Sequence, residues 1–148
     1  MKRIVVVAAV LAFSAGAVVA QQDQVKRTQA MMKDNGKNAG ALSAMVKGEK
    51  PYDQATVNTA LTQFDDTAKK LPMLFPESIK GKPFEGDYSP SSKIWEDKAG
   101  FSEHIASFAK AVGDAKGKIK DVDSLKVELS VIGKQCGGCH ETYRIKKT

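Results

Sequence analysis

Both cysteines of the chain and one of its two histidines lie close together near the C-terminus. Cys136, Cys139 and His140 form the pattern Cys-x-x-Cys-His in the segment KQCGGCHETYR. On an α-helix, residues three and four positions apart share a face, so both thiols and the imidazole can meet one bound group. Thiols at this spacing can form thioether bonds to the vinyl groups of a haem, and the adjacent histidine can bind its iron. The pattern therefore predicts covalently attached haem c with His140 as an axial iron ligand.

Two other kinds of site use the same residue types. A zinc site needs about four ligands, so the Cys136, Cys139 and His140 side chains would have to converge with the distant His104. A thioredoxin-like redox pair usually follows a strand of a βαβ unit and opens a helix. The pair in this chain lies late in a helical segment, and a disulfide closing so small a loop would stabilise the fold very little. Haem attachment is therefore the interpretation that we favour.

Four segments have the periodicity of amphipathic helices. We expect them at about 22–47, 53–71, 93–116 and 121–145, and the last one carries both cysteines. The apolar stripe of the second segment is Val57, Leu61, Phe64, Ala68 and Leu71, and that of the third is Phe101, Ile105, Phe108 and Val112. Asp53 is expected to cap the second helix, and Asp121 or Asp123 to begin the fourth.

The connection between the second and third helices is long. Residues 72–92 hold four of the five prolines, and Pro72 is expected to end the second helix. The other two connections are short and favour antiparallel neighbours. No stretch has the alternation of a strand. The predicted fold class is therefore all-α, an antiparallel up-down four-helix bundle with one long crossover loop between helices 2 and 3.

The second axial position of the iron decides what a bound haem can do. Five side chains are candidates for it: Met31, Met32, Met45, Met73 and His104. In the first helical segment, the core-facing positions are Val25, Met32, Ala39 and Val46, with Thr28, Asn35 and Leu42 between them. Met32 lies in this phase, and Met31 is turned about 100° away from it. Met32 is therefore the candidate ligand, with core filling as the other role for a methionine there. We expect His104 at the edge of the bundle, in contact with solvent.

Residues 1–20 have the layout of a secretory signal peptide. A basic start precedes an apolar run, and small residues lead up to the expected cleavage after Ala20, with Ala17 as the alternative. Residues 21–148 would then form one haem-binding domain. Because the apolar run is short for a membrane span, we expect an exported, periplasmic protein without membrane insertion.

The charge is mildly basic and spread along the chain. The formal net charge is +6, and the lysines are interleaved with acidic residues. A nucleic-acid interface would cluster basic and aromatic side chains, so no nucleic-acid partner is expected. A local basic patch in the C-terminal segment YRIKKT is suited to steering an acidic partner.

The chain resembles the class II c-type cytochromes, the cytochrome c′ family. The resemblance rests on the Cys-x-x-Cys-His pattern and on the blocks MKDNGKNAGALSAMVKGEKPYD, LPMLFPESIKG, KIWEDKAGF and IGKQCGGCHETYR. It covers the whole mature chain and implies an up-down four-helix bundle with one covalently attached haem c per chain. It also implies a protein without enzymatic activity, with other periplasmic redox proteins as partners and with a homodimer as one assembly that family members form.

The family has two branches that differ at one position of the first helix. In five-coordinate, high-spin members an apolar residue there leaves the iron open to nitric oxide or carbon monoxide. In the low-spin cytochrome c-556 branch a methionine at that position ligates the iron, and the protein carries electrons. The block MKDNGK places Met32 at this position. The resemblance therefore implies an electron carrier with His140 and Met32 as ligands, and a gas-binding cytochrome c′ is the alternative.

Two further positions bear on the resemblance. Many relatives carry an arginine four residues before the distal position, near a haem propionate, and this chain has Thr28 there with Arg27 beside it. Arg144, four residues after His140, matches the family pattern and is expected on the haem side of the last helix.

Overall fold

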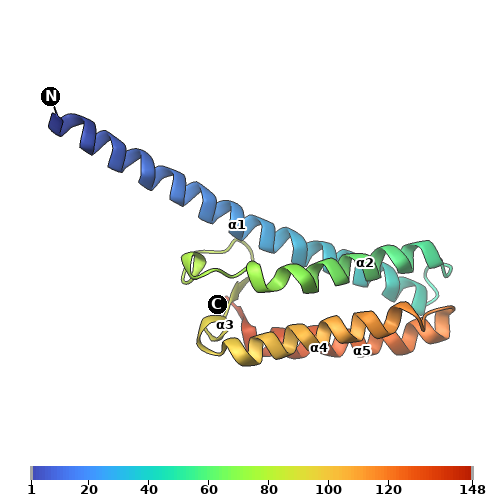
Figure 1. Ribbon diagram of the computed structural model, residues 1–148. Helices are drawn as coiled ribbons and strands as arrows, with labels where there is room; N and C mark the ends of the chain where they lie inside the picture. Colours follow the sequence, from blue (N-terminus) through green and yellow to red (C-terminus); the bar gives the residue numbers. More distant parts are fainter. Residues whose placement is uncertain (1, 148) are drawn as a thin grey trace.

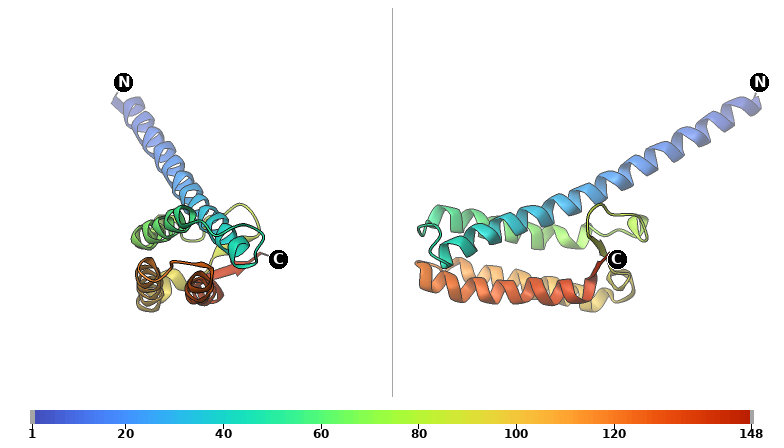
Figure 2. Two further views of the ribbon diagram at one scale, coloured as in Figure 1. Left: turned by 90° about the vertical axis from the view of Figure 1, so that its right-hand side faces the viewer. Right: turned by 180° about the vertical axis from the view of Figure 1, so that it is seen from behind.

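Four long helices form the body of the protein. The computed structural model describes residues 2–147, and their side chains from Asp23 onward. The helices are α1 (Lys2–Val46), α2 (Gln54–Lys70), α4 (Lys98–Lys116) and α5 (Val122–Tyr143). Figure 1 and Figure 2 show α1 and α2 in one layer and α4 and α5 in the other. Each of these helices contacts the next, and α5 contacts α1, which closes the bundle. The predicted all-α four-helix bundle is confirmed.

Helix α1 is longer than the periodicity predicted. It begins at Lys2 instead of near residue 22, and its N-terminal part projects away from the bundle (Figure 1). The structure does not describe the side chains of residues 1–20, so the signal peptide predicted there stays a prediction. Within the part of the chain that the structure describes, none of the helices has both the length and the hydrophobicity of a membrane span.

Side-chain caps begin α2 and α5 and so set the two short connections. Asp53 accepts a hydrogen bond from the Thr56 backbone N–H at 2.8 Å, as predicted. Asp121, not Asp123, caps α5, because its carboxylate accepts from the Ser124 N–H at 2.8 Å while the Ser124 hydroxyl accepts from the Asp121 N–H at 3.1 Å. Such reciprocal capping satisfies backbone donors that have no partner inside the helix.

The predicted apolar stripes form the core. Every residue of the α2 and α4 stripes is buried, and the rings of Phe64 and Phe108 meet across the two layers with centroids 6.3 Å apart. In α1, Thr28 and Leu42 are buried and Met32 is half-buried. The core-facing side chains of α1 therefore point between the two layers. Met32 is one of them, so it can reach a group bound there.

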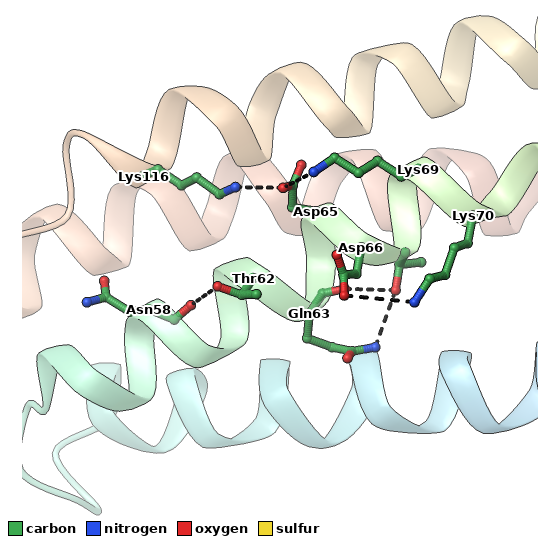
Figure 3. Close-up of polar contacts among 9 residues, drawn as sticks. Asn58, Thr62, Gln63, Asp65, Asp66, Lys69, Lys70 and Lys116 are labelled. Carbon is green, nitrogen blue, oxygen red and sulfur yellow. Dashed lines mark hydrogen bonds and ion pairs between the residues drawn. The ribbon is translucent and has the colours of Figure 1, made fainter.

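An ion pair ties α2 to α4 at the surface. The carboxylate of Asp65 lies 2.8 Å from the ammonium groups of both Lys69 and Lys116, while the Gln63 side chain on the same helix points toward α1 (Figure 3). The two lysines lower the pKa of Asp65, with the hydrogen bond from Lys116 as the larger cause. Because the lysines are largely exposed, we regard this pair as a minor contribution to stability.

The segment between α2 and α4 is more ordered than a plain loop. It holds two short 3₁₀ turns, Leu71–Met73 and Glu77–Ile79, and the four-residue helix α3 (Lys93–Glu96). Six of its apolar side chains are buried in the core, namely Leu71, Leu74, Ile79, Phe84, Ile94 and Trp95. The third predicted helix, 93–116, begins and ends as expected, but it is interrupted after its first turn. The backbone leaves helical geometry at Asp97 (φ −121°, ψ 65°), and α4 begins at the next residue.

A two-stranded antiparallel sheet was missed by the sequence patterns. Strand β1 (Tyr88–Pro90) pairs with β2 (Arg144–Lys146), with Ser89 opposite Ile145. The last helix therefore ends at Tyr143 instead of running to about residue 145. Strands of three residues are too short to show alternation, and these two are paired across a separation that local patterns do not reveal.

Candidate haem site

A cavity lies between the two helical layers. Its volume is about 580 Å³, within the range of about 300–1,000 Å³ that is typical of ligand and cofactor sites. Residues of α1, α2, α4 and α5 line it, and the segment around β1 closes one side. Gly36 on α1 and Gly133 on α5 both line it, and a Cβ atom at either position would have no atom within 4 Å. The site thus leaves open space in front of both layers, which suits a large planar group.

Cys136, Cys139 and His140 all line this cavity from α5. Their spacing places them on one face of the helix, as expected from the pattern. The two thiols are free and half-buried, and burial raises the pKa of each. Burial lowers the pKa of His140, with the nearby Arg144 charge as a second cause. A lowered pKa keeps the imidazole neutral near pH 7, the form in which histidine binds a metal.

The two glycines between the cysteines lie beside the haem-site residues of α5 but outside the cavity wall. Gly137 and Gly138 do not line the cavity, and a Cβ atom on Gly138 would lie 3.6 Å from the imidazole of His104. His104 lines the cavity from α4 and stacks edge-on against Tyr143, with ring centroids 5.5 Å apart. His104 is half-buried, so it keeps the predicted contact with solvent, but it also lines the cavity, which the prediction did not include. His104 belongs to the same layer as His140.

Met32 is the methionine that lines the cavity. Met45 is buried in the core, and Met73 is 68% exposed in the segment after α2. Met31 is half-buried and packs on the core, but it lies outside the cavity wall. Met32 belongs to α1, in the layer opposite to the one that carries His140. The turn of about 100° between adjacent residues therefore separates the two neighbouring methionines as predicted.

A hydrogen bond joins the end of α5 to the start of α4 beside the site. The Tyr143 hydroxyl donates to Asp97 Oδ2 at 2.8 Å, and Asp97 Oδ1 accepts from the Gly100 backbone N–H at 3.0 Å. A Cβ atom on Gly100 would lie 2.6 Å from the Tyr143 oxygen, so this close approach needs glycine. The sequence patterns missed this link. The signal in the chain was an aspartate three residues before a glycine at a helix start.

This link predicts a specific pH dependence of stability. Burial and the Asp97 carboxylate raise the pKa of Tyr143 from 10.0 to about 12. Between these values the unfolded chain releases a proton that the folded protein keeps, so the free energy of unfolding falls as the pH rises. In Tyr143→Phe, the fall in the free energy of unfolding between pH 10 and about pH 12 that Tyr143 causes should be absent. Urea unfolding of both proteins, followed by circular dichroism below and within this pH window, measures the difference. Parallel declines would contradict the assignment.

The geometry disfavours the two alternative sites. Within the described residues, no group of three or more His, Cys, Asp and Glu side chains is arranged to hold a metal ion, so the four zinc candidates do not converge. The cysteines lie within a helix that continues to Tyr143, not at a helix start after a strand. Their raised pKa values also disfavour thiolate chemistry, which needs a lowered pKa.

Thr28 and Arg144 both line the cavity, but their surroundings differ. Thr28 lines the cavity and is buried, and its one hydroxyl proton is shared between the backbone oxygens of Gln24 at 2.9 Å and Leu74 at 3.1 Å. Arg27 beside it is exposed. Arg144 lines the cavity, as expected for the haem side, and its guanidinium lies 4.1 Å from the centre of the Tyr88 ring. Arg144 and Lys33, both exposed, are the Arg and Lys side chains that line the cavity within the described residues.

The comparison with known proteins finds close relatives along the whole chain. The family model described as Cytochrome C′ matches residues 23–144. Cytochrome c-556 of Rhodopseudomonas palustris is 60% identical over 148 residues and covers 99% of each chain. Cytochrome c′ of the same organism is 39% identical over 146 residues, which is 99% of this chain and 98% of that protein.

Solved structures agree with the sequence relatives. An NMR-validated structural model of oxidized cytochrome c556 from R. palustris superposes with a TM-score of 0.77 at 59% identity, covering 86% of this chain and 99% of that one. Cytochrome c′ from R. palustris superposes with a TM-score of 0.76 at 40% identity, covering 85% and 98%. Both names therefore occur among the structures that are similar to this chain.

Proposed function

Since the chain belongs to the cytochrome c′ family of c-type cytochromes and carries one covalently attached haem c, we propose that it is a periplasmic electron carrier with His140 and Met32 as axial ligands. The observation that carries this proposal is the place of Met32. Met32 lines the cavity from the layer opposite His140, whereas Met31, Met45 and Met73 do not line it. A thioether sulfur on that side is a ligand suited to a low-spin iron.

The roles of the α5 residues follow from their chemistry. Cys136 and Cys139 would each hold the haem through one thioether bond, formed when the S–H group adds across a vinyl double bond. His140 contributes its neutral imidazole from the same helix face. Bound haem supplies a one-electron iron couple, and a histidine and methionine pair raises its potential. Iron ligands from both layers of the bundle would keep the same coordination in the oxidised and reduced states. The structural reorganisation that accompanies electron transfer would then be small.

The surface around the opening supports a redox partner of acidic character. Arg144, Lys146 and Lys147 are exposed next to each other at the end of the chain, and Arg144 also lines the cavity. Positive charge beside the opening favours encounters with an acidic surface and weakens with salt. The partners proposed are other redox proteins of the periplasm, with a homodimer as an assembly to be tested, and the protein catalyses no reaction of its own.

Export rests on the N-terminal segment. Residues 1–20 have the layout of a signal peptide, and the family match begins after them, at residue 23. Covalent attachment of haem takes place outside the bacterial cytoplasm, so export and the cysteine pattern support each other. Cleavage after Ala20 would leave residues 21–148 as the haem-binding domain.

An absorption spectrum of the reduced holoprotein tests the proposed ligation. Six-coordinate, low-spin haem should give sharp, resolved α and β bands, and the reduced protein should not bind carbon monoxide. A broad, featureless band together with carbon monoxide binding at neutral pH would instead identify the five-coordinate, gas-binding alternative. The spectrum therefore separates the two branches of the family in one measurement.

A further inference from the structure

A small polar cluster interrupts the apolar wall on the Met32 side of the cavity. It consists of Asn35 on α1 and Thr67 and Gln63 on α2, of which Asn35 and Thr67 line the cavity. The neighbouring wall residues on these helices include Met32, Phe64 and Leu71. Thr67 is fully buried, so its hydroxyl needs an internal partner to offset the loss of water.

The cluster holds the Asn35 carboxamide in one orientation. The Thr67 hydroxyl lies 2.9 Å from Asn35 Oδ1 and 3.0 Å from the Gln63 backbone oxygen, so its one proton is shared between these two acceptors. Gln63 Nε2 donates to Asn35 Oδ1 at 3.4 Å. Figure 3 shows the Gln63 side chain directed from α2 toward α1. Because the amide nitrogen of Gln63 can only donate, the Asn35 atom that it meets is the acceptor oxygen. The –NH₂ group of Asn35 is then directed away from α2.

The two N–H donors of Asn35 remain available. Among the described residues, Asn35 Nδ2 makes no hydrogen bond, whereas Asn38, one turn further along α1, donates to the Asp34 backbone oxygen at 2.9 Å. Asn35 follows Met32 by three positions, so the two side chains are neighbours on one helix face. An amide donor with a fixed oxygen thus lies beside the proposed axial ligand.

We propose that Asn35 is a hydrogen-bond donor for the atom bound on the Met32 side of the iron, oriented by Thr67 and Gln63. This proposal rests on the proposed haem ligation. With Met32 in place, the recipient is the second lone pair of its sulfur. When the sulfur is removed, the recipient is an axial ligand of the lone-pair-bearing, anionic class. Asn35 and Thr67 are positioning residues in this arrangement, and they do not touch the iron.

The test uses the holoprotein with Met32→Ala, which opens the axial position to added ligands. Azide binding to the ferric form and carbon monoxide binding to the ferrous form are titrated by absorption. Azide is a charged acceptor and carbon monoxide is a poor one. Adding Asn35→Leu should weaken azide binding about tenfold, the effect of losing one hydrogen bond to a charged group. Carbon monoxide affinity should change less than about twofold.

Three further variants separate this role from a structural one. Thr67→Val removes the hydroxyl that orients Asn35 and should weaken azide binding in the same direction, while Thr67→Ser should restore it. Asn38→Leu makes the same change one turn away, outside the cavity wall, and should leave both affinities unchanged. Equal loss of azide and carbon monoxide in Asn35→Leu, or no loss of azide, would overturn the proposal. Carbon monoxide binding by the unmodified reduced holoprotein, or failure of the Met32→Ala parent to bind either ligand, would instead overturn the proposed ligation.

Discussion

Replacing Met32 with leucine should convert the haem from low-spin to high-spin. Leucine keeps the volume of the half-buried side chain, so the packing cost should stay below about 1.5 kcal/mol. It has no lone pair for the iron, however, and the reduced variant should lose its sharp α and β bands and bind carbon monoxide. The reduction potential should fall, because a methionine ligand raises it. Absorption spectra and a redox titration of the holoprotein measure both changes.

Met31→Leu is the matched control for this prediction. Met31 is the adjacent residue on α1, is also half-buried and also packs on the core, but lies outside the cavity wall. Its absorption spectrum and reduction potential should stay those of the unmodified protein. The loss of stability from packing should be similar to that of Met32→Leu. A low-spin spectrum in Met32→Leu, or a spin change in Met31→Leu, would show that Met32 is not the axial ligand.

Replacing both cysteines should abolish covalent haem attachment. In the double variant Cys136→Ala, Cys139→Ala, no thioether bond can form, so the haem should pass completely into an organic solvent after acidification. The unmodified protein should keep its haem in the protein phase. The protein expressed with the haem-attachment machinery of a bacterial periplasm provides the sample, and the pyridine haemochrome spectrum of each phase provides the measurement.

Each single replacement is an internal control for the double one. One remaining thioether should keep the haem bound through acid extraction, while the haemochrome band shifts in the direction of a haem with one unsaturated vinyl group. Both thiols line the cavity, so both single variants should behave alike. Complete retention of haem in the double variant would show that the attachment does not run through these sulfur atoms.

Local patterns in the chain were enough for the helices and for one face of the site. The stripes of α2 and α4 are buried at every predicted position, and Asp53 caps α2 as expected. Cys136, Cys139 and His140 meet one cavity because helix geometry alone puts positions three and four apart on one face. The same geometry distinguished Met32 from Met31. These features depend on residues within one or two helical turns, so sequence spacing contains them.

Other features needed contacts between distant segments. Strand β2 follows α5 directly and pairs with β1, and this pairing ends α5 at Tyr143. The Tyr143–Asp97 hydrogen bond requires the end of one helix to pass the glycine at the start of another. The sequence around either residue does not indicate its partner. A hydrogen bond between two helices depends on how the helices pack and not on periodicity.

The residues of this chain, read in order, predicted which atoms would bind the cofactor and which helix face would carry them. The packed bundle specified what surrounds those atoms. His104, expected in contact with solvent, is half-buried and also lines the cavity, and the Asn35 side-chain oxygen lies within hydrogen-bonding distance of Thr67 and Gln63 on α2. A side chain's chemistry is contained in its type and local spacing. Its environment depends on neighbours brought from far along the chain, and those neighbours are set when the two layers of helices pack together.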